Sequence, residues 1–159
     1  GLHFTDETIE ALKAKGVVVE EITLHTGPGT FLPVRVEDIS THRVPSEYYR
    51  IDEQVVESIR KAKADGGRVV AVGTTVTRAL EAAFSKDEVL LEAMTDIFIY
   101  PPYGFRVVDA LLTNFHLPES SLLMLVSALA GRERIIEAYN EAVAEKYRFF
   151  SYGDCMLII

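Results

Sequence analysis

Several features are scarce in this 159-residue chain, and each scarcity excludes a class of protein. The single cysteine, Cys155, cannot form an internal disulfide, which argues against a disulfide-stapled secreted domain. The longest apolar run, residues 122–130, contains Ser127 and is far shorter than the roughly 20 residues that cross a bilayer. We see no signal peptide, so we expect a cytoplasmic protein with no membrane partner.

Positive charge is scarce as well. Lysine and arginine total 16 against 24 aspartates and glutamates, so the net charge is −8. That balance counts against a protein whose main role is to grip phosphate backbones. Hydrophobic residues make up 48% and charged residues 25%, an ordinary globular balance. We therefore expect one domain over residues 1–159.

Side chains that bind transition metals are few and scattered. The four histidines and the cysteine show no paired ligand spacing, so we expect no metal; they are His3, His25, His42, His116 and Cys155. Cys155 leads into the apolar end of the chain and is interpreted as a core residue rather than a nucleophile.

Residues 107–132 are the stretch around which the chain is organised. Residues 107–112 are apolar except for Asp109, which is typical of a buried strand. Polar residues follow at 113–116, Pro118 suits the first turn of a helix, and residues 120–130 are apolar on nearly every face. In open α/β sheets, ligands bind beyond the carboxyl ends of strands, so Thr113, Asn114 and His116 form a candidate site.

A second strand–corner–helix unit lies at residues 68–81. Gly73 lets the backbone turn, and Thr74 or Thr75 can cap the helix while its amide groups stay open to an anion. Arg78 follows on the first turn. A threonine cap with a surface arginine is an equally good interpretation on local grounds.

Two glycine-rich segments complete the candidate corners. The turn at residues 26–31 places Gly27 and Gly29 around a proline, where the backbone can approach a ligand closely, although a plain turn between strands is the simpler interpretation. The opening before Thr5 has the character of a third corner whose strand lies upstream, so we expect a piece of a longer protein.

Strands alternate with helices along the chain, which predicts an α/β fold with a mainly parallel sheet flanked by helices. We expect strands at 17–25, 68–73, 96–100 and 107–112, and we expect the last segment, 148–158, to end in a buried strand. We expect helices at 5–16, 52–63, 74–81 and 120–130, and a further amphipathic helix marked by Ile135, Ile136, Tyr139 and Val143. Parallel strands would bring the corners to one edge, where they would line a single crevice.

The assembled segments carry a family resemblance along essentially the whole chain. They are 1–5 (GLHFT), 24–34, 46–48, 72–81, 95–101 (TDIFIYP), 108–118 (VDALLTNFHLP), 122–133 and 148–154 (RFFSYGD). In this order they resemble the S-adenosylmethionine:tRNA ribosyltransferase-isomerase family of queuosine biosynthesis, in its carboxyl-terminal half.

The resemblance implies a reaction and its partners. Such enzymes transfer the ribosyl part of S-adenosyl-L-methionine to 7-aminomethyl-7-deazaguanine in the tRNA wobble position, giving epoxyqueuosine. Family members are about twice as long, with an α/β domain and an inserted β-barrel domain. The resemblance therefore implies an incomplete α/β domain without the barrel, a missing amino-terminal half, and an uncovered sheet edge open to self-association.

The candidate residues are weighed against that chemistry. His116 is the first candidate for proton transfer and His3 the second, although a corner histidine is also a common turn residue. Asp109, expected to be buried and paired, could steady the sulfonium. The substrate-binding candidates are Gly27, Gly29, Thr30, Phe31, Gly73, Thr74, Thr75, Arg78, Thr113, Asn114 and Phe115.

Three positions depart from the family pattern: Pro45 stands where a second histidine is usual, Pro102 replaces a glycine and Glu119 replaces a lysine. Pro45 matters most, because it removes a group able to donate or accept a hydrogen bond. The alternative hypothesis is therefore a divergent or truncated relative that binds S-adenosylmethionine or tRNA without turnover.

Overall fold

The structure is a computed structural model that describes residues 3–27 and 33–159. Its α-helices are α1 (Asp6–Ala14), α2 (Glu53–Ala64), α3 (Thr74–Ala83), α4 (Ser121–Ala130) and α5 (Arg132–Ala144), with a 3-10 turn, η2, at Ile39–Thr41. Its strands are β1 (Thr23–Leu24), β2 (Glu47–Arg50), β3 (Val70–Val72), β4 (Glu92–Thr95), β5 (Ala110–Asn114) and β6 (Cys155–Ile158). The α/β class is confirmed.

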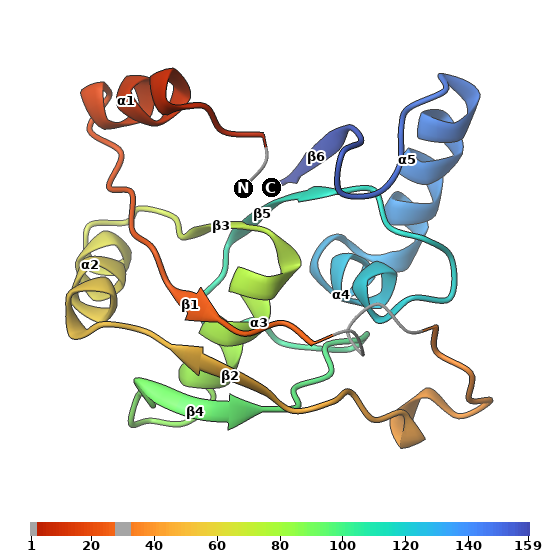
Figure 1. Ribbon diagram of the computed structural model, residues 1–159, viewed down its shortest axis with the longest axis horizontal. Coiled ribbons are helices and arrows are strands. Elements are labelled where there is room, and N and C mark those ends of the chain that lie inside the picture. The colour runs from red at the N-terminus through yellow and green to blue at the C-terminus, as the bar shows by residue number, and fades with distance from the viewer. Residues whose placement is uncertain (1–2, 28–32) are drawn as a thin grey trace.

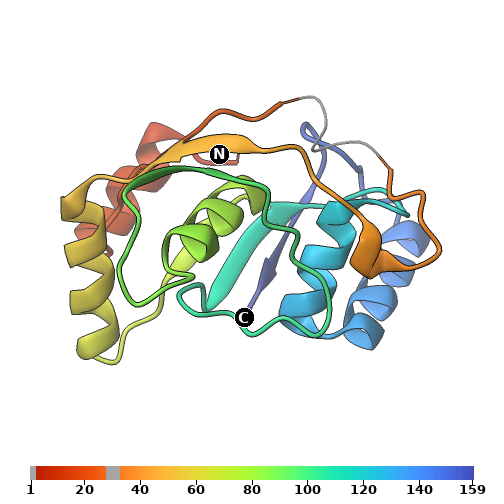
Figure 2. The same cartoon turned by 90° about the horizontal axis from the view of Figure 1, so that it is seen from below.

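The elements form layers around α3. One sheet has the order β1-β2-β4 and the other β3-β5-β6, and α3 lies between them (Figures 1 and 2). Helices α3 and α4 lie on the same side of the second sheet, where Ala71, Leu111 and Ile158 point into the core. Their burial stabilises the fold by roughly 25 cal/mol per Å² of apolar surface removed from water.

The expectation of a mainly parallel sheet is wrong. Among the strands of the described residues, only β3 and β5 pair in parallel, and the other three pairings are antiparallel. The cause is the helical hairpin α4–α5. One helix after β5 would return the chain to start a parallel strand, but the second helix brings it back, so β6 begins beside the end of β5, with Cys155 opposite Asn114.

Two of the expected strands are also wrong in extent. The strand expected at 96–100 lies instead at β4, Glu92–Thr95. Its antiparallel partner β2 begins at Glu47, opposite Thr95, so among the described residues no strand pairs with 96–100. The strand placed at 17–25 is reduced to Thr23–Leu24. Val17 and Val18 stay exposed.

Helix ends follow the local sequence more closely. The Thr5 hydroxyl accepts from Thr8 N at 3.2 Å and caps α1, as expected. Pro118 is a correction: it lies in a turn before α4, where Glu119 has a φ of 58° and Ser120 caps the helix by accepting from Leu123 N. In the described ranges, no helix is long and apolar enough to cross a membrane.

Candidate functional site at the end of strand β5

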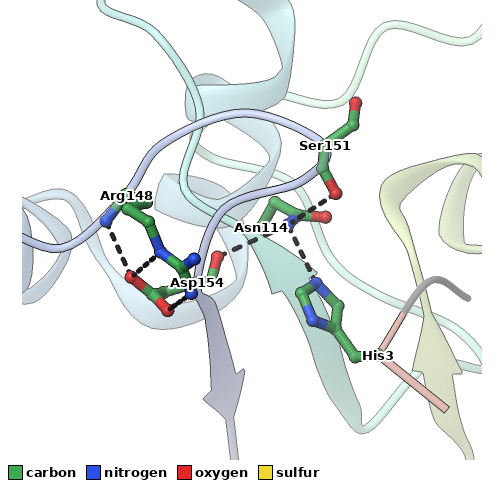
Figure 3. Close-up of polar contacts among 5 residues, drawn as sticks. All are labelled: His3, Asn114, Arg148, Ser151 and Asp154. Atoms are coloured by element: carbon green, nitrogen blue, oxygen red, sulfur yellow. Dashed lines mark hydrogen bonds and ion pairs between the residues drawn. The ribbon is translucent and has the colours of Figure 1, made fainter.

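The last residue of β5, Asn114, is the centre of a polar cluster. Its Nδ2 lies 2.9 Å from His3 Nε2 and 3.4 Å from the backbone oxygens of Ser151 and Asp154 (Figure 3). These groups come from three segments: the first residues of the chain, the end of β5 and the turn that precedes β6. The structure therefore joins two sequence-predicted residues, His3 and Asn114, that are 111 positions apart.

The turn before β6 is held by an ion pair across its base. Arg148 N donates to Asp154 Oδ2 at 2.7 Å, and Arg148 Nη2 lies 3.0 Å from Asp154 Oδ1. The Arg148 side chain and backbone hydrogen bonds lower the pKa of the Asp154 carboxyl below its usual range. Gly153 is required here, because an added Cβ would lie 2.2 Å from the Arg148 oxygen. The turn is therefore a rigid support for the two carbonyls that face Asn114.

His116 lies on the other face of β5. Thr113 and Asn114 are neighbours in a strand, so their side chains point to opposite faces, and Thr113 Oγ1 is 3.2 Å from His116 Nε2. Burial lowers the pKa of His116 to about 4, so the imidazole is neutral near pH 7. Its backbone N–H donates to the Tyr139 hydroxyl at 2.8 Å. The structure thus separates the two histidines that the sequence places together.

Phe115 belongs to the core. It is 5% exposed and its ring packs edge-on against Tyr139 and Tyr147, and in a tilted contact against Phe149. The expectation that Phe115 contacts substrate is not supported by this position, because a ring enclosed by three others has no free face for a purine.

The second corner joins β5 directly. Gly73, with a φ of 98°, donates its N–H to the Leu112 oxygen at 2.8 Å and leads into α3. Gly73 occupies the N-cap position of α3 and has no side chain, so no side chain caps this helix. Thr74 is buried and Thr75 half-buried at the first turn, where helix amide groups favour an anion. Gly73, Thr74 and Thr75 therefore lie at the carboxyl edge, as expected.

Arg78 is buried rather than exposed, with a side chain 5% accessible. Its Nη1 lies 2.6 Å from Glu47 Oε2 and its Nε 3.3 Å from the Ile97 oxygen. In the described part of the chain, Nη2 has no hydrogen-bond partner. Glu47 Oε1 accepts from Gly27 N at 2.9 Å, so this pair links Gly27 to α3. The other turn candidates, Gly29, Thr30 and Phe31, lie outside the described residues.

Asp109 is a correction. It precedes β5, at the opposite end from Asn114, and a strand of this length separates them by about 16 Å. Asp109 is exposed rather than buried, and its carboxylate binds Lys63 Nζ at 2.5 Å and Val69 N at 2.8 Å. Burial raises the pKa of Asp109, but the hydrogen bonds from Lys63 and Val69 N outweigh it and the net shift is downward. The strand starts three residues later than expected, which moves Asp109 away from the corner.

Sequence reasoning missed a buried carboxylate, Glu81. Fully buried on α3, it accepts the Tyr103 hydroxyl at 3.2 Å and three backbone N–H groups, from Arg106, Val107 and Val108, at 2.9 to 3.1 Å. The desolvation of Tyr103, followed by the Glu81 charge, raises the pKa of that hydroxyl. The available signal was a glutamate three positions after Arg78, in the second half of a helix whose other residues there are alanine and leucine.

The described residues contain no cluster of side chains that could hold a metal ion. Within residues 3–27 and 33–159, no three His, Cys, Asp or Glu side chains are grouped to hold an ion.

Known proteins resemble this chain throughout. The model of the family described as "Queuosine biosynthesis protein" matches residues 1–158. An S-adenosylmethionine:tRNA ribosyltransferase-isomerase of Desulforamulus reducens is 56% identical over 161 residues, which cover 100% of this chain and 47% of the relative. The protein of the same name from Sulfurihydrogenibium sp. is 58% identical, and the match again covers 100% of this chain and 47% of the relative.

A solved structure agrees with the fold. The S-adenosylmethionine tRNA ribosyltransferase of Thermotoga maritima superposes with a TM-score of 0.82 at 48% identity, over 99% of this chain and 50% of that one. The chain thus spans about half the length of the relatives it matches. With the family model matched over nearly every residue, this chain belongs to the queuosine biosynthesis protein family.

Proposed function

We propose that this chain is the carboxyl-terminal part of an S-adenosylmethionine:tRNA ribosyltransferase-isomerase. The complete enzyme would transfer the ribosyl moiety of S-adenosyl-L-methionine to 7-aminomethyl-7-deazaguanine in the tRNA wobble position, without a metal, to give epoxyqueuosine. The observation that carries the proposal is the meeting of His3 and Asn114 at the carboxyl end of β5, in a chain more than half identical to enzymes with that name. Acting on tRNA, the enzyme would work in the cytoplasm.

The substrate would bind along the carboxyl edge shared by β3 and β5. His3 is the polar side chain best placed to meet it, because its ring projects from a segment that lies beside the end of β5 (Figure 3). The amide groups of Thr74 and Thr75, at the first turn of α3 where no side chain caps the helix, suit the carboxylate of the methionine portion. Thr113 and His116 would shape the corner from its buried side, and Arg78 would hold Gly27 through Glu47.

The remainder of the protein would complete the site. The chain spans 47% of its relatives, and one face of the β3-β5-β6 sheet is covered by none of the helices that the structure describes. Val70, Val72, Leu112 and Leu157 share that face, because they pair across the strands or alternate along them. Val70 is 50% exposed and Leu157 57%. We call these four residues the open face, and propose that the amino-terminal half of the complete polypeptide covers it.

The test is an incubation of the complete polypeptide with S-adenosylmethionine and tRNA that carries the deazaguanine base, followed by nucleoside mass spectrometry. A gain equal to the epoxycyclopentane ribosyl group, with release of adenine and methionine, is expected. Binding of S-adenosylmethionine without any gain in nucleoside mass would instead support the non-catalytic alternative that Pro45 raises.

A further inference from the structure

The hydrogen bonds around Asn114 determine how its amide is oriented. Backbone carbonyls can only accept, and two of them, from Ser151 and Asp154, face the same terminal atom of Asn114. That atom must therefore be the NH2 nitrogen rather than the oxygen. The ion pair between Arg148 and Asp154 supports the turn that carries both carbonyls, so the orientation does not depend on the histidine (Figure 3).

The same nitrogen lies 2.9 Å from His3 Nε2. The NH2 group has two hydrogens for three acceptors, so the 2.9 Å contact with His3 Nε2 takes one and the two carbonyls at 3.4 Å share the other. His3 Nε2 therefore accepts, and an imidazole nitrogen that accepts carries no proton. The proton of the neutral ring is then on Nδ1. Figure 3 shows the Nδ1 side of the ring turned away from Asn114, and among the described residues no hydrogen bond is formed by Nδ1.

We propose that Asn114 is a positioning residue that holds neutral His3 in the Nδ1–H tautomer, so that His3 presents a hydrogen-bond donor at the carboxyl edge of β5. The role toward substrate rests on the proposed function: Nδ1–H would donate to an acceptor atom of the ribosyl donor, such as a purine ring nitrogen or a ribose oxygen. A neutral imidazole that donates in this way stabilises negative charge as it develops, without a full proton transfer.

The tautomer is measurable by NMR without any assay of activity. Two ring carbons of histidine, Cδ2 and Cε1, carry a hydrogen. Nε2 is bonded to both of them and Nδ1 only to Cε1, so long-range nitrogen–proton correlations identify which nitrogen lacks a proton. The complete polypeptide, labelled with 15N-histidine, is studied at about pH 8, where an ordinary histidine is neutral. His3 is assigned by loss of its signals in His3→Gln. We expect the bare nitrogen of His3 to correlate with both ring protons.

Substitution of Asn114 changes the hydrogen-bond partner of His3 and leaves the imidazole ring itself unaltered. In Asn114→Asp the carboxylate can only accept, which should move the proton to Nε2; Asn114→Ala removes the donor and should release the ring to the Nε2–H form that free histidine favours. Asn140→Asp, the same change at an exposed position on α5, is the matched control and should leave His3 unaltered. A wild-type His3 with the proton on Nε2, or an unchanged tautomer in folded Asn114→Ala, would overturn the proposal.

Kinetics of the same variants test the role toward substrate separately. Loss of the donor should lower kcat by about 10²-fold or more while KM changes little. An inverted tautomer with normal kcat would refute the contact with substrate but not the tautomer. A wild-type polypeptide with no ribosyl transfer at all would instead refute the proposed function, and the NMR result would be independent of it.

Discussion

At the scale of single residues, the two histidines near the end of β5 differ in their surroundings. His116 is enclosed on the core side, where Thr113 and Tyr139 hold its side chain and backbone. His3 is half-buried at the edge and contacts Asn114. A corner histidine cannot be assigned to one situation or the other from sequence, since both kinds follow an apolar strand. The alternation of Thr113 and Asn114 along β5 is what separates them.

The buried His116 makes a pH prediction. The pKa of His116 is about 4 in the folded chain, below its ordinary value of 6.5, so between these values the unfolded chain binds more protons than the folded one. The contribution of His116 to stability therefore falls as the pH falls from 6.5 to 4, by about 3 kcal/mol, and no further below that. Denaturant unfolding of wild type and His116→Gln should show a difference in unfolding free energy that changes by about this amount across the window. A constant difference would show that His116 titrates normally.

The ion pair of Arg78 with Glu47 makes a prediction about stability. Both side chains are at most 5% exposed, so Glu47→Gln leaves a guanidinium buried without its counter-charge. The loss should be about 3–5 kcal/mol in the free energy of unfolding. The same substitution in the exposed pair of Glu10 with Lys13, Glu10→Gln, should leave stability almost unchanged, because solvent screens that pair. Urea denaturation with equal effects for both variants would contradict the buried pair.

At the scale of elements, the helices could be predicted from the sequence because their signals are local. Thr5 caps α1 and Gly131, with a φ of 90°, separates α4 from α5, as residue type alone indicates. Pro118 shows the limit: its preference for a first helical turn gave way to the Ser120 cap two residues later. A helix start at Pro118 and one capped by Ser120 are both consistent with the local sequence, so only the packed structure decides between them.

Strands were harder to predict because a strand exists only where it has a partner. Residues 96–100 have the apolar, aromatic character of a strand, yet the partner strand β2 begins opposite Thr95 and leaves them unpaired. The antiparallel β6 has the same origin: two consecutive helices after β5 reverse the expected direction, and the helical periodicity of each says nothing about their combined effect.

The candidate site was predicted in part for a similar reason. Asn114 ends β5 and Gly73 follows β3, where the rule that ligands bind beyond the carboxyl ends of strands places them. Asp109 was misplaced because the start of β5 is not marked in an apolar run. The contacts of Glu81 with the backbone of residues 106–108, and of Asn114 with Ser151, join distant segments and leave no local pattern to detect.

At the scale of the whole molecule, the open face separates what this chain does alone from what it does in the complete polypeptide. Exposed Val70 and Leu157 adjoin the partly buried Leu112 in one apolar surface. Contiguous apolar surface of this kind, beside unpaired strand edges, favours association. The isolated chain should therefore self-associate, and the amino-terminal half should compete with that self-association.

A charge placed on the open face tests this arrangement. Leu157→Lys should cost the isolated chain little stability, because Leu157 is already 57% exposed, and should reduce its self-association. In the complete polypeptide the same lysine would be buried, so its melting temperature should fall by several degrees. Val143→Lys, at a position 65% exposed on α5 and away from the open face, is the matched control and should have no effect in either form. Light scattering and thermal melts give both readouts, and a complete polypeptide indifferent to Leu157→Lys would show that its amino-terminal half lies elsewhere.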